Sequence, residues 1–169
     1  CGFLGRHGST QVYHSGFTRG SRGVAFLMSI MIHFQCERIW HDQLGQHIGV
    51  TSFIQGFKIS FLCTYASPPL SVEFTNTLRA ILIEFPQGMQ VLGGYFNAVL
   101  DTDLDRYRSC GSSGVPSPPA QLARFVRMTG LMDAWRWCHP GDRSYSFFLP
   151  HTTLSQELIP FWSQLPYAH

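Results

Sequence analysis

Charged residues are scarce in this sequence, and lysine is almost absent. Charged residues make up 13% of the 169 residues, the formal net charge is +2, and Lys58 is the single lysine among 12 basic residues. So small an excess does not by itself indicate nucleic-acid binding, because DNA-binding surfaces need clustered positive charge. Arginine favours bidentate contacts to phosphate, but a coding bias toward arginine explains the same composition. DNA binding therefore stays open at this point.

Membrane-spanning runs and cysteine motifs are also missing. The longest nearly unbroken apolar run, residues 24–32, is about half of the roughly 20 residues that cross a bilayer. The five cysteines are odd in number and widely spaced, with no C-x-x-C pair, which argues against a disulfide framework or a zinc site. We expect reduced thiols in an intracellular protein, nuclear or cytoplasmic, without a membrane span.

The start of the chain carries no recognisable targeting signal. Cys1 is the first residue, and no basic segment followed by an apolar one comes after it, as a secretion signal requires. A hydrophobic content of 44% fits one globular core. We expect a single, incomplete domain over residues 1–169, in which residues 159–169 form a degenerate tail.

Alternating apolar residues predict a β-hairpin in the first half of the chain. Residues 47–54 and 57–65 are strand-like and flank the turn-like pair Gln55 and Gly56. Their alternation indicates one buried face and one mixed face. Tyr65 then lies at the end of the second strand.

The pattern next predicts a helix and a buried strand. Apolar spacings of three and four over residues 70–85 indicate a helix that stops before a proline, with Ser67 or Ser71 as its N-cap. The short apolar run at residues 89–94 ends in two glycines and is typical of a buried strand. Residues 95–97 therefore lie where a strand opens into a loop.

The second half of the chain is less regular. A second helix is expected over residues 120–129, ending at Gly130. Residues 131–143 are expected to form an aromatic-rich loop, followed by a short strand over residues 144–149. The remaining segment has two prolines and no clear period, so no element is expected there.

Hairpins, a helix and a buried strand ending near an asparagine suggest a layered α/β sandwich with its site at the strand ends. Five ordered motifs carry a resemblance: "SRGVAFLM", "FLCTYASPP", "VLGGYFNAVLDTDLDR", "GLMDAWRWCHP" and "YSFFLPH". Across residues 13–158 the sequence resembles the endonuclease domain of LINE-type (non-LTR) retrotransposons. This domain is a branch of the endonuclease/exonuclease/phosphatase superfamily, which includes the AP endonucleases.

The resemblance implies a four-layer αββα sandwich, here truncated at its N-terminus. It also implies Mg²⁺-dependent nicking of DNA, which primes reverse transcription by a reverse transcriptase domain on the same chain of the intact element. If N-terminal strands of the domain are lost, exposed sheet edges predict poor solubility.

The resemblance places the catalytic centre at residues 95–97. The family motif there is G-D-F-N, in which the aspartate orients the attacking water with the metal and the asparagine positions the phosphate. Asn97 matches the asparagine, whereas Tyr95 stands where the aspartate is expected. Tyr65 matches the tyrosine of the family's Tyr-Ala-Pro motif, although Ser67 replaces the proline.

The resemblance also implies nucleic-acid contacts for three residues. Ser146, in "YSFF", matches a family Ser or Thr that contacts DNA, and Arg22 and Arg106 lie in loops that the family places near DNA. A scattered, solvated set of arginines is an equally good interpretation.

Several acidic groups of the family pattern have no counterpart. Residues 1–22 contain no match to the metal-binding glutamate motif, Glu157 is out of register with a second aspartate, and His169 lacks the context of the family's terminal histidine. We therefore expect no bound Mg²⁺ and no cleavage. Two alternatives stay open: a non-catalytic nucleic-acid-binding remnant, and a residual nuclease in which Glu157, Asp101 or Asp103 holds the metal.

Two further groups of residues have ordinary structural interpretations. Asp101, Asp103 and Asp105 alternate like metal ligands but lack the other residues of a calcium loop, so a solvated loop is favoured. Asp105 is expected to have a structural role. The following aromatic residues are expected to be core residues rather than a base-stacking platform: Trp135, Trp137, Tyr145, Phe147 and Phe148.

Overall fold

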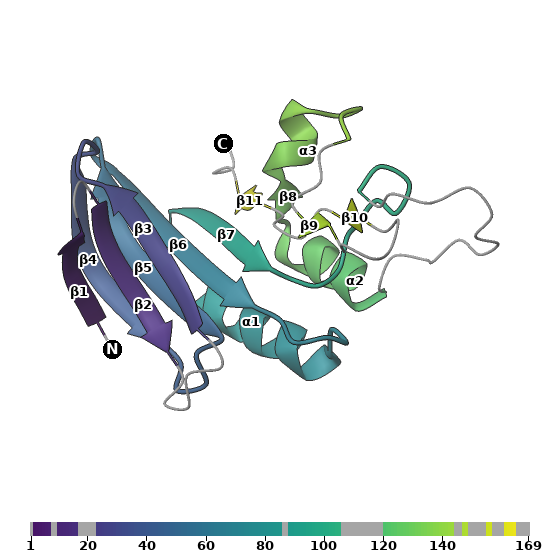
Figure 1. Cartoon of the computed structure of the whole chain (residues 1–169), viewed down its shortest axis with the longest axis horizontal. Helices are drawn as coiled ribbons and strands as arrows, with labels where there is room; N and C mark the ends of the chain where they lie inside the picture. Colours follow the sequence, from purple (N-terminus) through teal and green to yellow (C-terminus); the bar gives the residue numbers. More distant parts are fainter. Residues whose placement is uncertain are drawn as a thin grey trace.

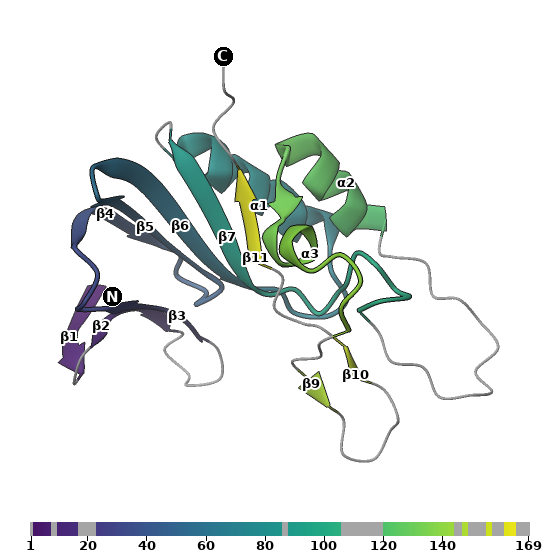
Figure 2. The ribbon, with the colours of Figure 1, turned by 90° about the horizontal axis from the view of Figure 1, so that it is seen from above.

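Two β-sheets pack face to face, and helices cover the outer face of the larger sheet (Figures 1 and 2). A computed structural model describes residues 2–7, 10–16, 23–85, 88–105, 120–143, 147–148, 155–156 and 161–164. Within these residues the layers are helix, large sheet and small sheet. The α/β sandwich expected from the sequence is confirmed, with three of its four expected layers described.

The large sheet has six strands in the order β4-β5-β6-β7-β11-β8. Its strands are β4 (Phe34–His41), β5 (His47–Ile54), β6 (Phe57–Tyr65), β7 (Met89–Tyr95), β8 (Met132–Asp133) and β11 (Phe161–Gln164). β4, β5 and β6 form an antiparallel meander, and the predicted hairpin turns at Gln55 and Gly56, both at positive φ. β7 pairs with β6 in parallel, because α1 returns the chain to the starting end of the sheet.

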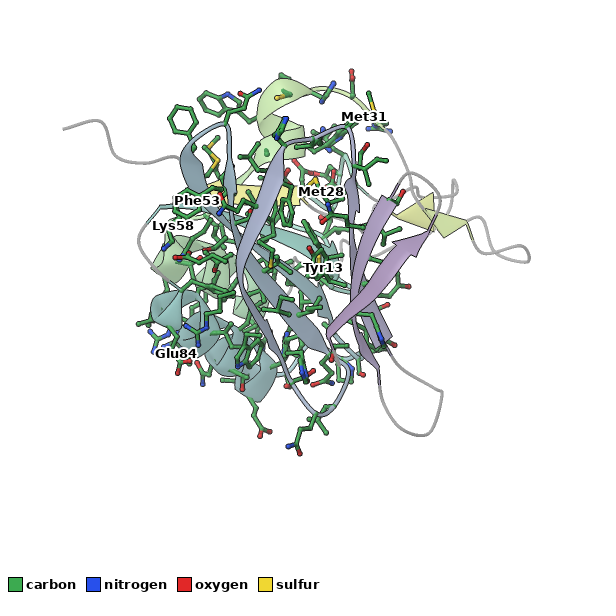
Figure 3. All side chains as sticks on the ribbon, turned by 90° about the vertical axis from the view of Figure 1, so that its left-hand side faces the viewer. Tyr13, Met28, Met31, Phe53, Lys58 and Glu84 are labelled. Atoms are coloured by element: carbon green, nitrogen blue, oxygen red, sulfur yellow. The ribbon has the colours of Figure 1, made fainter. Side chains whose placement is uncertain are left out.

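The small sheet consists of β1 (Gly2–His7), β2 (Thr10–Gly16) and β3 (Gly23–Ser29) in that order. It packs on β5 and β6. It does not extend over the other edge of the large sheet, where β11 and β8 lie (Figure 2). Phe26 fills the space between the sheets and contacts the rings of Tyr13, Phe34 and Phe61, with centroid distances of 5.0–6.0 Å. Figure 3 shows Tyr13 and Met28 in this layer, which forms one of two apolar cores.

The second core lies between the large sheet and the helices. α1 (Val72–Glu84) begins at Ser71, whose Oγ accepts a hydrogen bond from Phe74 N, so Ser71 rather than Ser67 is the N-cap. α1 and α2 (Ala120–Thr129) bury their apolar stripes against β6 and β7. Among the described residues, none of the helices is both long and apolar enough to cross a membrane.

The segment after α2 departs from the sequence expectation. Residues expected to form a loop instead form β8 and the short helix α3 (Ala134–Cys138), because the Asp133 side chain accepts a hydrogen bond from Arg136 N and caps α3. Trp137, expected in the core, is 73% exposed. Residues 161–164, for which no element was expected, form β11 beside β7. Its pairing comes from a distant strand, which a local pattern does not reveal.

Two-residue strands β9 (Phe147–Phe148) and β10 (Ser155–Gln156) pair with each other, which agrees with the short strand expected near residue 147. The predicted second helix is confirmed as α2, and Gly130 follows it at a φ of 66°. This left-handed conformation favours glycine.

Gly94 allows β7 to approach β6 closely. Its φ is 146°, and a Cβ at this position would meet the carbonyl oxygen of Thr64. Only glycine tolerates both conditions. The glycine pair that ends the apolar run therefore includes one glycine required by sheet geometry, and this geometry brings the next residue of β7 beside the end of β6.

Candidate functional site

The candidate site is formed by the C-terminal ends of the parallel strands β6 and β7. Tyr65 and Tyr95 are register partners at this end, and their rings stack with a centroid distance of 5.8 Å and an interplanar angle of 20°. Both side chains are half-buried. The resemblance placed both residues in one catalytic centre, and the structure brings them together.

Asn97 lies two residues beyond Tyr95 and links the two strand ends. Its Nδ2 donates to Ala66 O over 2.8 Å, and Ala66 N donates to Tyr95 O over 2.8 Å. Its φ of 53° lies in the left-handed region, which asparagine tolerates better than most residues. Asn97 is therefore both a turn residue and a member of the strand-end cluster. One N–H of its amide is used within the protein, and the second N–H is the group that could donate to a phosphate.

A buried polar network supports the end of β6 from the helix side. Thr64 Oγ1 lies 2.7 Å from His47 Nδ1, and His47 is 2% exposed, with its ring against Phe74. The carboxylate of Asp42 accepts hydrogen bonds from the backbone N–H of Gln46 and His47. Gln46 O in turn accepts from Tyr65 N over 2.8 Å. The β4–β5 loop therefore holds Tyr65 in place.

Burial lowers the pKa of His47, and the negative charge of Asp42 opposes part of this shift. The imidazole is therefore neutral near pH 7 and serves as a hydrogen-bonding group. His47 is not among the residues that the sequence motifs predict at the site. In the sequence, the histidine stands at the start of the strand-like run 47–54, two residues after Gly45. In the structure, this run is the largely buried strand β5, and Gly45 has a positive φ.

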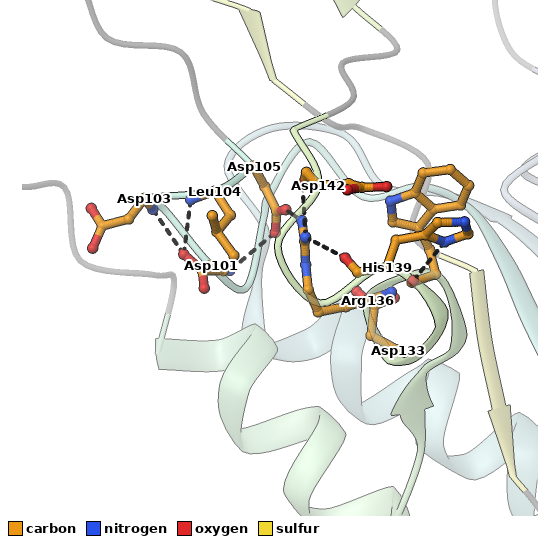
Figure 4. Close-up of polar contacts among 9 residues, drawn as sticks. Asp101, Asp103, Leu104, Asp105, Asp133, Arg136, His139 and Asp142 are labelled. Carbon is orange, nitrogen blue, oxygen red and sulfur yellow. Dashed lines mark hydrogen bonds and ion pairs between the residues drawn. The ribbon is translucent and has the colours of Figure 1, made fainter.

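Two of the three aspartates after the site, Asp101 and Asp105, have side chains with a structural role (Figure 4). Asp101 Oδ1 accepts hydrogen bonds from Asp103 N and Leu104 N, which closes the loop on itself. Asp105 is 5% exposed and forms an ion pair with Arg136 of α3. The expected structural role of Asp105 is confirmed, whereas the expected solvation holds only for Asp101 and Asp103.

Arg136 connects this loop to the turn after α3. Its Nη1 donates to His139 O over 2.9 Å and to Asp142 O over 2.8 Å, while Nη2 contacts Asp105 (Figure 4). The side chain of Trp135 stacks on His139 with a centroid distance of 3.9 Å. His139 thus packs against the ring of Trp135.

The donors at the strand ends do not fit a magnesium site. Mg²⁺ prefers charged carboxylate oxygens in octahedral geometry, but the described side chains here are two phenols and one amide. Within the part of the chain that the structure describes, no three His, Cys, Asp or Glu side chains gather closely enough to hold a metal ion. Arg22, Arg106, Ser146 and Glu157 lie outside the described residues, so their expected roles stay predictions.

Solved structures share this fold, although no protein-family model matches the chain. The endonuclease domain of TRAS1, a telomere-specific non-LTR retrotransposon, is 12% identical with a TM-score of 0.63; the match covers 92% of this chain and 65% of that domain. The Xenopus laevis APE2 catalytic domain is 13% identical with a TM-score of 0.64, covering 92% and 66%. D. rerio TDP2 complexed with a single-strand DNA product is 12% identical with a TM-score of 0.58, covering 92% and 62%.

These neighbours are all proteins of the endonuclease/exonuclease/phosphatase fold, and this chain has the same fold. The resemblance drawn from the sequence motifs is confirmed at this level. The chain spans 62–66% of the length of the three neighbours.

We expect substitution of His47 to reduce the pH dependence of stability. A histidine whose pKa is lowered in the folded state binds fewer protons than in the unfolded chain, so stability is lost as the pH falls through the unfolded value of about 6.5. Urea unfolding at about pH 8 and about pH 5.5 should show a smaller loss for His47→Gln than for the wild type. The same change at exposed His33 is the control, and equal losses in all three proteins contradict the assignment.

We expect Asp105→Asn to lower the free energy of unfolding by about 1.5–3 kcal/mol, because it removes a largely buried, charged hydrogen-bond acceptor of the Arg136 guanidinium. The Glu37–Lys58 pair has side chains 43% and 29% exposed, so Glu37→Gln should cost about 1 kcal/mol or less. Denaturant titration of both variants measures the difference. Equal costs would show that the buried pair contributes no more than the surface pair.

Proposed function

We propose that this chain is the endonuclease-type domain of a LINE-like retrotransposon and that it binds DNA without cleaving it. The stacked pair of Tyr65 and Tyr95 carries the proposal, because it puts a neutral aromatic ring where the sequence resemblance expects the catalytic aspartate. The fold shared with the TRAS1 endonuclease domain supports the retrotransposon origin. In the intact element, a reverse transcriptase domain on the same chain would be the partner.

The chemistry of phosphodiester hydrolysis supports the absence of cleavage. The reaction needs charge neutralisation on the phosphate oxygens and a base that orients water, usually supplied by carboxylate-bound Mg²⁺ and by a carboxylate or histidine. A phenol is neutral near pH 7 and does not replace a carboxylate in either task. His47 is 2% exposed and hydrogen-bonded to Thr64, so it is not placed to orient a water at the phosphate.

The surroundings of Asp101 and Asp103 weigh against the alternative of a residual nuclease. Asp101 uses its Oδ1 to close its own loop, and Asp105 is paired with Arg136. A metal ion bound at Asp101 Oδ1 would have to compete with the two backbone N–H groups of this loop. A plasmid-nicking assay therefore distinguishes a residual nuclease from a domain that does not cleave DNA.

DNA binding rests on the neutral polar groups at the strand ends and on the arginines. Tyr65 and Asn97 remain available beside a bound phosphate, and a D. rerio TDP2 neighbour is complexed with single-strand DNA. The basic residues expected at the DNA are Arg22 and Arg106, with exposed Arg143 in the same half of the fold as α3. A net charge of +2 predicts weak, salt-sensitive binding.

Plasmid nicking with Mg²⁺ or Mn²⁺ tests the loss of catalysis. We expect wild type, Tyr95→Asp and Asn97→Ala to stay at the buffer background, because one restored carboxylate does not complete a metal site with several missing donors. Metal-dependent nicking by the wild type that disappears in Asn97→Ala would establish a working nuclease. Nicking by Tyr95→Asp alone would show that Tyr95 is the only defect.

Fluorescence anisotropy with a labelled oligonucleotide tests DNA binding. We expect the oligonucleotide to bind at low salt and the affinity to fall as the salt concentration rises. In Arg22→Gln and Arg106→Gln, the slope of log affinity against log salt concentration should be shallower by about one for each lost phosphate contact. Arg79→Gln on α1, away from the strand ends, is the matched control. Absence of binding at low salt would remove the DNA-binding part of the proposal.

A further inference from the structure

A cavity of about 400 Å³ lies between the β4–β5 loop and the first turns of α1. Trp40 of β4 and Asp42 of the loop line one side, and Glu73, Phe74 and Thr77 of α1 line the other. The volume falls within the range of pockets that hold small molecules. This space, termed the α1 cavity, is separate from the candidate site, because the stacked tyrosines do not line it.

The buried imidazole of His47 also lines the α1 cavity. The residue is 2% exposed, and its Nδ1 lies 2.7 Å from Thr64 Oγ1. Its Nε2 has no hydrogen-bond partner within the part of the chain that the structure describes, yet it is not among the fully buried polar atoms that lack one. Nε2 therefore touches open space, and the α1 cavity is the space that His47 lines. A polar atom of a buried side chain is thus available to a ligand.

The charges that face the α1 cavity are negative. The carboxylate of Asp42 accepts hydrogen bonds from the backbone N–H of Gln46 and His47 and from Ser15 Oγ, all of which are neutral donors. Glu73 is exposed and forms no ion pair with another described residue. No lysine or arginine lines the cavity. Two carboxylates without a compensating cation favour a positively charged ligand.

The remaining walls are largely apolar. The rings of Trp40 and Phe74 line the cavity together with Leu44 and Ile81. Aromatic faces attract ammonium and guanidinium groups, and apolar walls hold the carbon skeleton that carries such a group. A hydrated metal ion does not suit these walls. The search for metal-holding groups of His, Cys, Asp and Glu found none here or elsewhere among the described residues.

We propose that the α1 cavity binds a small organic cation, in which an ammonium or guanidinium group is attached to an apolar body. The carboxylates of Asp42 and Glu73 supply the electrostatic attraction. His47 Nε2 accepts a hydrogen bond from the cation when Nδ1 carries the proton of the neutral ring. The rings of Trp40 and Phe74 contact the apolar body.

A macromolecule suits the α1 cavity less well than a small molecule does. Among the residues that line it, Leu44 is the one large apolar side chain that is exposed, at 55%. Surfaces that bind proteins usually expose a contiguous apolar patch. A nucleic acid carries phosphate charges that the two carboxylates would repel.

Benzamidine and benzamide are matched probes, because they have nearly the same shape and only benzamidine is charged near pH 7. Ligand-observed NMR titration of the full chain measures both affinities. We expect saturable binding of benzamidine, with benzamide weaker by about fivefold or more. In hydrogen exchange, benzamidine should slow the amides of Gln46 and His47 and leave those of Gln55 and Gly56, in the distant hairpin turn, unchanged.

Charge variants on α1 locate the cation. Glu73→Gln should weaken benzamidine binding by about two- to fivefold, because it removes one exposed charge partner. Glu84→Gln is the matched control, since Glu84 is also exposed on α1 but does not line the cavity. Both changes remove one negative charge from the same helix, so a general electrostatic effect would alter both proteins equally.

A variant that fills the cavity tests its location without changing charge. Thr77 is exposed on α1 and lines the cavity, so Thr77→Trp should weaken benzamidine binding by about tenfold or more. Ala80 is exposed on the same helix outside the lining, so Ala80→Trp should bind as the wild type does. The comparison of benzamidine with benzamide needs no variant and stands even if Thr77→Trp fails to fold.

Four results would overturn the proposal. They are no saturable binding at millimolar benzamidine, equal affinity for benzamidine and benzamide, equal effects of Glu73→Gln and Glu84→Gln, and unchanged binding by Thr77→Trp. Binding of the peptide Gly-Gly-Arg-Gly-Gly about tenfold tighter than benzamidine would identify a polypeptide side chain as the occupant and would equally overturn it. None of these results depends on whether the chain binds or cleaves DNA.

Discussion

The parallel pairing of β6 with β7 positions every described residue of the candidate site. The crossover through α1 starts β7 beside the beginning of β6, and Gly94 removes the Cβ that would collide with the backbone of Thr64. With the strands in this register, Tyr65 and Tyr95 end side by side and Asn97 reaches the carbonyl of Ala66. A side chain at position 94 would separate the strands, and the three residues would no longer form one cluster.

Polar contacts hold the end of β6, and the charged group among them, Asp42, is used to order a loop. Asp42 orders the β4–β5 loop, His47 bonds to Thr64, and Gln46 O holds the backbone of Tyr65. These contacts preserve the position of the site without supplying negative charge to it. The buried ion pair of Asp105 and Arg136 acts in the same way, since its charges fasten a loop to α3. The charges of Asp42 and Asp105 are thus used in contacts that hold the loops around the strand ends.

The unequal widths of the two sheets create the second notable surface. In the part of the chain that the structure describes, the small sheet has three strands and the large sheet has six, so an apolar face of β6 and β7 lies beside the uncharged edge of β3. Tyr65 and Tyr95 line the cavity between these strands and also belong to the candidate site. The two surfaces differ in chemistry, because one offers hydrogen-bonding groups and the other offers apolar side chains and an open backbone edge.

Local patterns in the sequence determined the hairpin at Gln55 and Gly56, the helix capped by Ser71, the buried strand before Tyr95 and the helix ended by Gly130. These elements follow from side-chain period, capping and backbone freedom, which act over a few residues. The motif containing Asn97 also indicated the strand-end site. Only the tertiary structure decided that His47 lies under Tyr65, that Arg136 neutralises Asp105, that β11 inserts between β7 and β8, and that β3 keeps an open edge. Each of these features depends on which distant segments pack together. The spacing of neighbouring residues does not specify which strand pairs with which, or which side chain is buried under another.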